Sequence, residues 1–407
     1  MRLTVERLGH RGDGIAKGVF VPGTLPGEVV EGEVAGDRME APRIVTPSPD
    51  RVRPPCPHAR ACGGCALQHA SDSFVAGWKR GAVESALAGR GIVAEVGPPV
   101  TSPSRSRRRA VLAGRRGKAG PMVGFHMRGS AQVVPVPGCL LLHPDLMATL
   151  PGLAGITRIG ASRKGELALT VTRSLTGPDL AVTGGRELTA DMRQDLAALA
   201  ETQGFARLTW EGEPVAQRAA PLVAFGPARV ELPPGGFLQA TEQGEAALLA
   251  AVTEAVGDAR RIVDLFAGSG TFALPLAARA EVHAVEGEAA PVAALLAGWR
   301  RAQGLKKVTA ETRDLFRNPL TPDELRRFDV AVIDPPRAGA EAQTRALAEA
   351  RVPVIAAVSC NPVTFARDAE ILIGAGYRID RIQVVDQFRW STHVELAAHF
   401  SLPHIAP

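Results

Sequence analysis

The feature that most constrains the fold is the regular alternation of short hydrophobic segments and helical segments from about residue 240 onward. A helix predicted over 242–256 precedes a strand at 261–266, and further strands follow near 281–286, 307–313, 328–334, 352–359, 379–386 and 393–400. Helices fit between most of the earlier strands, but the last two strands are too close for one. This pattern predicts a doubly wound α/β domain, because strand–helix–strand units build parallel sheets.

Two further regions precede this domain. Residues 1–48 hold short β-rich runs broken by glycine, a spacing typical of a small antiparallel barrel. Prolines over 47–55 indicate a linker. Residues 49–235 then predict a central α+β domain, which includes a helix over 72–91, and residues 236–407 form the α/β domain.

The charge of the chain permits an acidic partner. The formal net charge is +5 and the pI is about 9.2. Between residues 101 and 130 the chain carries eight arginines and lysines and no acid: Arg105, Arg107, Arg108, Arg109, Arg115, Arg116, Lys118 and Arg128. Such a run is typical of a phosphate-contacting surface, and a solvated loop is the alternative.

Nothing in the sequence predicts a membrane segment or an export signal. The N-terminus has no apolar signal core. No apolar run approaches the ~18 residues that span a bilayer. We therefore expect a cytoplasmic protein with no membrane partner, in a compartment where thiols stay reduced.

Three of the five cysteines are clustered. Cys56, Cys62 and Cys65 lie close together, Cys139 follows after a gap, and Cys360 is distant. In a reducing compartment a cluster of this kind indicates metal ligands rather than disulfides. Four thiolates suit either a zinc ion or an iron–sulfur cluster, and the spacing does not choose between them. Buried free thiols are the alternative.

A glycine turn after the first strand of the α/β domain predicts a cofactor site. Gly268 and Gly270 stand between that strand and a helix, the geometry that lets a ligand approach the backbone. Carboxylates lie at the ends of three successive predicted strands: Asp264, Glu286 and Asp314. A carboxylate-rich pocket favours a cationic cofactor without phosphates, such as S-adenosylmethionine. Another nucleotide or a purely structural turn is the alternative.

The segment Ser-Cys-Asn-Pro around Cys360 predicts a nucleophile at the end of the 352–359 strand. Arg337 follows Asp-Pro-Pro where enzymes that methylate amines usually carry an aromatic residue, and this loop lacks the second cysteine expected for cytosine C5 methylation. C5 of uracil is a poor nucleophile, but a thiolate that adds to C6 would enable C5 to attack a methyl group. Glu395 is the candidate base for the C5 proton, with His393 as its rival. An inert Cys360 is the alternative.

Together these residues resemble the RNA 5-methyluridine (uracil-C5) methyltransferase family, in particular its iron–sulfur-containing bacterial branch that acts on 23S ribosomal RNA. The resemblance covers nearly the whole chain. It implies a Rossmann-like class I methyltransferase domain with S-adenosylmethionine as cofactor. It also implies that residues 1–48 form an OB-like TRAM domain, although strands after Gly36 are hard to recognise. Cys56, Cys62, Cys65 and Cys139 match the ligand pattern of its 4Fe–4S cluster.

The resemblance also assigns roles to single residues. Cys360 corresponds to the nucleophile and Glu395 to the base. Phe237 and Arg337 are expected to contact the substrate. The residues expected to bind the cofactor are Gln239, Phe266, Gly268, Gly270, Thr271, Glu286, Asp314 and Asp334.

The function expected from the sequence is therefore methylation of a specific uridine in 23S rRNA by a monomeric enzyme. A tRNA uridine-C5 methyltransferase is the near alternative. A non-catalytic RNA-binding or redox-sensing protein is the alternative of another class.

Overall fold

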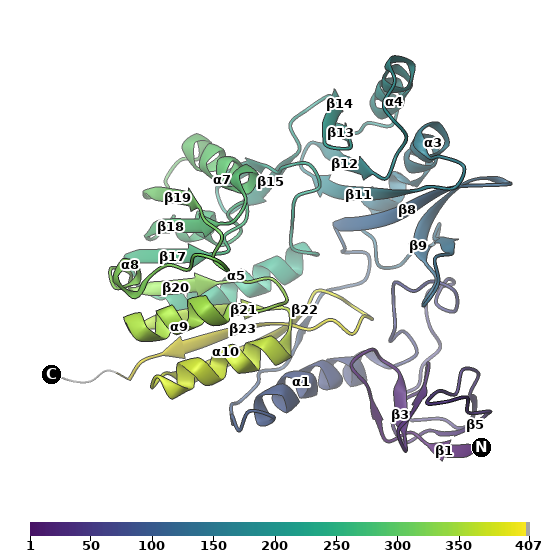
Figure 1. The fold of residues 1–407 in the computed structure, drawn as a ribbon, viewed down its shortest axis with the longest axis horizontal. Coiled ribbons are helices and arrows are strands. Elements are labelled where there is room, and N and C mark those ends of the chain that lie inside the picture. Colours follow the sequence, from purple (N-terminus) through teal and green to yellow (C-terminus); the bar gives the residue numbers. More distant parts are fainter. Residues whose placement is uncertain (404–407) are drawn as a thin grey trace.

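The largest sheet has eight strands in the order β19-β18-β17-β20-β21-β23-β22-β7, in a computed structural model that describes residues 1–403 (Figure 1). Its strands are β17 (Arg261–Leu265), β18 (Glu281–Glu286), β19 (Val308–Thr312), β20 (Val330–Ile333), β21 (Val354–Ser359), β22 (Arg378–Asp386), β23 (Glu395–Ser401) and β7 (Val100–Thr101). Strands β17 to β21 are parallel, and β23 runs antiparallel between β21 and β22. The predicted doubly wound α/β domain is confirmed.

Helices cover both faces of this sheet, and each face has its own buried hydrophobic cluster. One face carries α5 (Glu242–Val256), α6 (Ala273–Leu276), α7 (Ala289–Arg301) and the hairpin of β15 (Leu222–Phe225) and β16 (Ala228–Glu231). The other carries α1 (Asp72–Ala88), α8 (Pro322–Leu325), α9 (Glu341–Ala350) and α10 (Pro362–Gly374). Because both faces are covered, the central strands are continuous hydrophobic runs rather than alternating ones.

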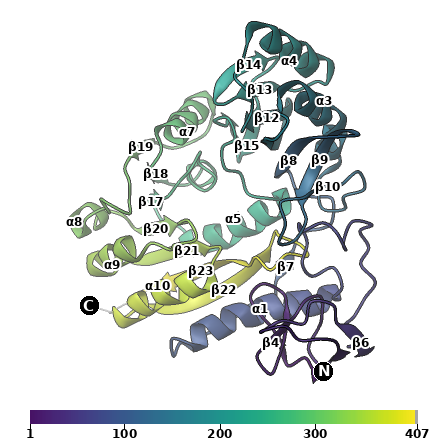
Figure 2. The same ribbon diagram turned by 45° about the vertical axis from the view of Figure 1, so that its right-hand side comes forward.

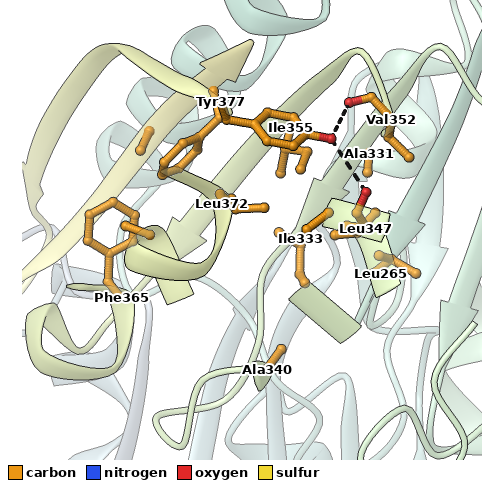
Figure 3. Packing of buried hydrophobic residues seen from close by; sticks show 14 of the residues in the cluster. Leu265, Ala331, Ile333, Ala340, Leu347, Val352, Ile355, Phe365, Leu372 and Tyr377 are labelled. Atoms are coloured by element: carbon orange, nitrogen blue, oxygen red, sulfur yellow. Dashed lines mark hydrogen bonds between the residues drawn. The ribbon is translucent and has the colours of Figure 1, made fainter. Parts of the chain in front are cut away.

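Figure 3 shows the core on the α9–α10 face. Tyr377 packs beside Leu372 and Ile355, and its hydroxyl donates to the carbonyl oxygen of Val352 at 2.7 Å. This hydrogen bond satisfies the only polar atom of the tyrosine side chain, so the ring is buried without leaving an unpaired group. The core therefore fixes the position of β21, the strand that ends immediately before Cys360.

A second sheet of seven strands forms the central part of the chain, in the order β10-β9-β8-β11-β12-β13-β14. Its strands are β8 (Arg109–Gly117), β9 (Gly120–His126), β10 (Val133–Pro135), β11 (Glu166–Ser174), β12 (Gly177–Thr183), β13 (Arg207–Trp210) and β14 (Glu213–Gln217). The helices of this part are α2 (Pro144–Ala148), α3 (Leu150–Gly160) and α4 (Ala190–Thr202). Buried residues of α3, α4 and the sheet share one hydrophobic cluster.

The N-terminal residues form two small three-stranded sheets. One contains β1 (Arg2–Thr4), β5 (Val29–Glu31) and β6 (Arg43–Thr46), and the other contains β2 (Arg7–Leu8), β3 (Gly14–Ala16) and β4 (Val19–Val21). Leu3, Val21 and Val30 are buried together between them. Strand β6 is the return strand that was hard to recognise after Gly36, because its four residues alternate poorly. The barrel interpretation stays a prediction.

Helix α1 connects the N-terminal sheets to the large sheet. Figures 1 and 2 both place it between the N-terminal strands and the β22–α10 side of the large sheet. Its buried residues Val83 and Leu87 belong to the same core as α10, and the short β7 pairs with β22. The predicted helix over 72–91 is confirmed except that it ends at Ala88, while the domain boundaries at 48 and 235 stay predictions. No helix within residues 1–403 is both long and apolar enough to cross a bilayer.

Candidate active site

Strand register brings Cys360 and Glu395 together. Cys360 follows the last residue of β21, and Glu395 is the first residue of β23. The two strands are antiparallel neighbours in which Ser359 pairs with Leu396. The end of one strand therefore lies beside the start of the other, although 35 residues separate the two side chains in sequence.

The loop around Cys360 is held by its neighbours. The Asn361 side chain caps α10 by accepting from the Val363 amide at 3.1 Å, and its Nδ2 donates to the Arg337 carbonyl oxygen at 2.9 Å. Pro362 occupies the first turn of the helix, where its missing N–H costs nothing. The Ser-Cys-Asn-Pro segment thus fixes a half-buried thiol against the Asp-Pro-Pro-Arg loop.

The electrostatics at Cys360 oppose its ionisation. Burial raises the pKa of the Cys360 thiol above its usual 9.0, and the nearby Glu395 and Asp334 carboxyls raise it further. The Arg337 guanidinium acts in the opposite direction. Arg337 therefore favours the thiolate, the nucleophilic form of the side chain.

Glu395 has the properties of a general base near neutral pH. Its side chain is buried, and this burial raises the pKa of its carboxyl to about 7, against the lowering effect of a hydrogen bond from Gln387. A base with such a pKa is well matched to proton transfer at cellular pH. His393 lines the cleft onto which Cys360 opens, and burial lowers the pKa of its imidazole, so it stays a rival base.

These pKa directions predict the pH dependence of the reaction. If Glu395 must be ionised to accept a proton, its protonation lowers the single-turnover rate roughly tenfold per pH unit below about 7, in addition to the effect of protonating the Cys360 thiol, so the slope of the rate profile should decrease above about pH 7. Measuring rates between pH 5.5 and 8.5 tests this, with a fluorescence check that the protein stays folded. A rate that does not change between pH 5.5 and 7.5 would exclude Glu395 as the base.

The glycine turn has the expected geometry. Gly268 and Gly270 adopt positive φ angles of 54° and 99°. A Cβ at position 270 would lie 2.8 Å from Leu274, so only glycine fits at this close approach of strand and helix. The Glu286 side chain accepts from the Gly268 amide at 2.9 Å. This bond ties the ends of β17 and β18 together, and the strand order reverses on the other side of β17, between β17 and β20.

Three carboxyl groups gather at the ends of the central strands. Burial raises the pKa of Asp264 to about 8, and burial raises that of Asp334 well above its usual range. The charges of Glu395 and Asp264 raise the pKa of Asp334 further, so the three carboxyl groups interact electrostatically. A cation bound beside them would stabilise their ionised forms, because opposite charge lowers a carboxyl pKa.

An aromatic pair flanks the glycine turn. Phe266 has a positive φ of 63°, unusual for a residue with a Cβ, and its ring lies 5.4 Å from that of Phe316. Phe316 is half-exposed and follows Asp314, whose carboxylate accepts from the Phe316 amide at 3.0 Å. Thr271, directly after the turn, is half-buried. Phe316 was not predicted, and its position two residues after a strand-end carboxylate is the available signal.

Phe237 and Gln239, two of the predicted site residues, have different surroundings. Gln239 is buried and its Oε1 accepts from Gln387 at 2.5 Å. Gln387 was not predicted. Phe237 is 65% exposed and is not among the described residues that line the cleft containing Cys360. Its predicted contact with the substrate stays a prediction.

Cys360 opens onto a cleft of about 1130 Å³ between the N-terminal sheets, the cysteine-rich segment (residues 56–66) and the large sheet. This exceeds the ~300–1,000 Å³ typical of small-molecule sites, which suits a larger substrate. Arginines outnumber acids among its charged lining residues, which are Arg11, Asp13, Arg38, Glu40, Arg107, Arg128, Arg337 and Arg389. The Arg107 guanidinium lies 5.7 Å from the centre of the Phe388 ring, which also lines the cleft.

The prediction of a phosphate-contacting surface over residues 101–130 was only partly right. Arg108 is buried and pairs with Glu245, and Arg109 donates to the carbonyl oxygens of Gly235 and Gly236. These two arginines hold the central sheet against the large one. Their donors are used within the protein, so they do not offer a phosphate-binding surface.

The four clustered cysteines share one small pocket. Cys56, Cys62, Cys65 and Cys139 line it together with apolar residues that include Phe125. Burial raises the pKa of Cys65 to about 12, and the other three thiols add to the shift, which places all four close together. Within residues 1–403, no group of three or more His, Cys, Asp or Glu side chains is arranged to hold a metal ion. The ligand role therefore stays a prediction.

Comparison with known proteins places the chain in one family. The sequence model described as tRNA (Uracil-5-)-methyltransferase matches residues 230–401. A protein of Brucella suis biovar 1 described as an uncharacterized RNA methyltransferase is 45% identical, over 98% of this chain and 97% of its own. The 23S rRNA (uracil(1939)-C(5))-methyltransferase RlmD of Halomonas elongata is 35% identical, over 97% and 88%.

The fold has a solved counterpart. The structure of Pyrococcus abyssi tRNA (uracil-54, C5)-methyltransferase in complex with S-adenosyl-L-homocysteine superposes with a TM-score of 0.76 at 23% identity, covering 98% of this chain and 99% of that one. The match therefore spans all three regions of the fold. The family model and the relative from Halomonas elongata both name uracil-C5 methylation, the relative from Brucella suis is named as an RNA methyltransferase, and the chain belongs to the RNA (uracil-C5)-methyltransferase family.

Proposed function

We propose that the protein transfers a methyl group from S-adenosylmethionine to C5 of a specific uridine in 23S rRNA, with Cys360 as nucleophile and Glu395 as base. The observation that carries the proposal is the strand register that sets the half-buried Cys360 thiol, which opens onto an arginine-rich cleft, beside the buried Glu395 carboxyl. The relative from Halomonas elongata supports ribosomal RNA as the substrate.

The proposed reaction uses Cys360 first and Glu395 afterwards. The Cys360 thiolate adds to C6 of the uracil, which makes C5 nucleophilic. S-adenosylmethionine, when bound, would supply the methyl group to C5 and leave as S-adenosylhomocysteine. Glu395 then accepts the C5 proton, the C6–Sγ bond breaks, and Cys360 leaves as a thiolate. Arg337 supports both the first and the last step, because it favours the ionised thiol.

The proposed cofactor site lies at the turn after β17, where Asp264 and Asp334 supply negative charge beside a sulfonium ion. Burial without a cation disfavours these carboxylates, so a cationic ligand complements them. The residues proposed to contact the cofactor are Gln239, Phe266, Gly268, Gly270, Thr271, Glu286, Asp314 and Asp334. Phe316 extends this group, since its ring lies against Phe266.

The RNA is proposed to bind in the cleft with its target base flipped out, because Cys360 cannot reach C6 in a stacked duplex. The two N-terminal sheets would act as the RNA-binding TRAM barrel. Their contribution to the cleft includes Arg11 and Arg38. With ribosomal RNA as its substrate the enzyme would act in the cytoplasm, where thiols stay reduced.

We further propose that Cys56, Cys62, Cys65 and Cys139 hold a 4Fe–4S cluster, with zinc as the alternative. Two observations support this proposal: the four thiols line one pocket, and the other residues around it include apolar side chains. A bound metal also removes the conflict of burying Cys65, because coordination favours the thiolate that burial disfavours. The cluster would join the cysteine-rich segment to the central sheet, since Cys139 follows β10.

Metal analysis tests this ligand set. Protein purified without oxygen is expected to contain about four iron atoms and a broad visible absorption. Cys65→Ser should lose most of both, while Cys360→Ser, outside the pocket, should keep them. Zinc in place of iron would support the alternative, and absence of both metals would refute the ligand role.

Nucleoside mass spectrometry of separated 23S rRNA and tRNA, from cells with and without the gene, tests the function. Loss of 5-methyluridine from 23S rRNA alone is the expected result. Loss from tRNA alone would identify the near alternative. No loss from either pool, with purified protein also inactive on both RNAs, would favour the non-catalytic alternative.

A further inference from the structure

Gln387 makes three hydrogen bonds inside the candidate active site. It follows β22 and is 2% exposed. Its Nε2 donates both to the Glu395 carboxylate and, at 2.5 Å, to Oε1 of Gln239. Its Oε1 accepts from the Ala240 amide at 2.7 Å. One side chain therefore connects the proposed base to the proposed cofactor contact.

These bonds define how the amide is oriented. The Ala240 amide is a donor, so it must face the Gln387 oxygen, and the nitrogen must then face Glu395 and Gln239. Both N–H groups of Gln387 are used. The bond reaches only Oε2 of Glu395, which leaves Oε1 to accept a proton.

The same network orients Gln239. Because Gln239 Oε1 accepts from Gln387, its Nε2 is left as the donor end, and this buried nitrogen has no hydrogen-bond partner among the described residues. A buried donor without a partner is costly unless a ligand supplies an acceptor. Gln387 thus orients Gln239 so that its Nε2 is free to donate a hydrogen bond to a bound ligand.

The backbone around Gln387 is fixed from two sides. The neighbouring Asp386 is buried in an ion pair with Lys79 of α1. On the other side α5 begins against the glutamine, and a Cβ at Gly244 would lie 2.5 Å from the Cβ of Gln387. The side chain therefore has little freedom to reorient, as a positioning residue requires.

We propose that Gln387 is a positioning residue that holds Glu395 ready to take the C5 proton and turns the donor of Gln239 toward the cofactor. The inference rests on the proposed function. Its consequence is that one residue couples the two ends of the reaction, the methyl donor and the proton acceptor, through a single buried amide.

Gln387→Met is the variant that tests this, because it keeps the size of the side chain and removes both donors and the acceptor. Its kcat should fall roughly ten- to hundredfold, since it loses a hydrogen bond to a charged group. The covalent protein–RNA adduct should accumulate on denaturing gels, because proton removal becomes slower than the preceding steps. The KM for S-adenosylmethionine should rise several-fold.

The pH profile gives a readout that a purely structural role would not change. Gln387 lowers the Glu395 pKa, so its removal should move the acid limb of the rate profile to higher pH. Two other titratable groups face Glu395 from neighbouring elements, Asp334 after β20 and Cys360 after β21. Both stay in place in Gln387→Met, and Asp386 remains paired with Lys79.

Gln343→Met is the matched control. Gln343 is as buried as Gln387, and it bonds the backbone of Leu320 at 2.8 Å, away from the site. This variant should lose comparable thermal stability and keep the kcat, the adduct level and the pH profile. Gln239→Met separates the effect on cofactor binding from the effect on the base. It should raise the KM for S-adenosylmethionine without accumulation of the adduct.

The outcomes distinguish the inference from the function on which it rests. Wild-type protein that methylates no RNA contradicts the proposed function. Active wild type with an unchanged Gln387→Met contradicts the inference alone, and so does a loss of kcat without adduct accumulation or a pH shift. If Gln387→Met does not fold, Gln387→Asn, which keeps a shorter amide, should show the same changes more weakly; an unchanged Gln387→Asn would then overturn the proposal.

Discussion

Replacing Cys360 with alanine is expected to abolish RNA methylation while the protein stays folded. Without the thiolate, C5 of uracil is too weak a nucleophile to attack a methyl group. We expect a loss of at least roughly 10³-fold in the single-turnover rate, about 4 kcal/mol in the activation barrier. The measurement is transfer of radiolabelled methyl groups to the RNA substrate.

The structure indicates that this substitution is mild for the fold. Cys360 is half-buried at the edge of the cleft, and the capping of α10 depends on Asn361 rather than on the thiol. Cofactor binding and the unfolding midpoint should therefore match those of the wild type. Cys360→Ser should be similarly inactive. Methylation by Cys360→Ala at a rate near that of the wild type would mean that the reaction does not proceed through a covalent adduct.

The second large effect, a loss of folding stability, is expected from Lys79→Met. Lys79 and Asp386 are both almost fully buried, with Nζ 2.5 Å from Oδ1, and Nζ also donates to the Phe388 carbonyl oxygen at 3.0 Å. Removing the lysine leaves a buried carboxylate without its counter-ion, which costs about 3–5 kcal/mol of unfolding free energy. Urea denaturation followed by tryptophan fluorescence measures this loss.

The adjacent residue offers a matched control. Arg80 pairs with Glu84 on the exposed face of α1, so Arg80→Met should cost no more than about 0.5 kcal/mol. Adding Asp386→Asn to Lys79→Met should restore part of the loss, because no unpaired charge is then buried. A Lys79→Met variant as stable as Arg80→Met would show that the ion pair does not hold α1 to the β22 end of the sheet.

Much of the site could be predicted because α/β topology constrains it. Parallel strands end at the same edge of a sheet, so Asp264, Glu286 and Cys360 could be placed together from their positions after hydrophobic runs. The closely spaced last two strands also brought Glu395 to this edge. The cysteine cluster was recognisable from spacing alone, and the structure places its four thiols around one pocket.

The residues that were missed depend on packing between distant segments. Gln387 has no motif, and its role appears only when α5, β22 and β23 are assembled. Arg108 was interpreted as part of a basic surface because its partner, Glu245, lies 137 residues away. The ion pair of Lys79 spans 307 residues. Local patterns predict elements and strand ends, but they do not show which charged side chains are paired inside the fold.

The most direct test of the account is peptide mapping after incubation with S-adenosylmethionine and RNA that contains 5-fluorouridine at the target position. Fluorine cannot leave C5 as a proton does, so the adduct formed after methyl transfer cannot break down. We predict a denaturation-resistant complex whose modified peptide contains Cys360 linked to a methylated fluorouridine. Failure of an enzyme active on normal RNA to form this complex, or attachment at another residue, would contradict the proposed covalent mechanism.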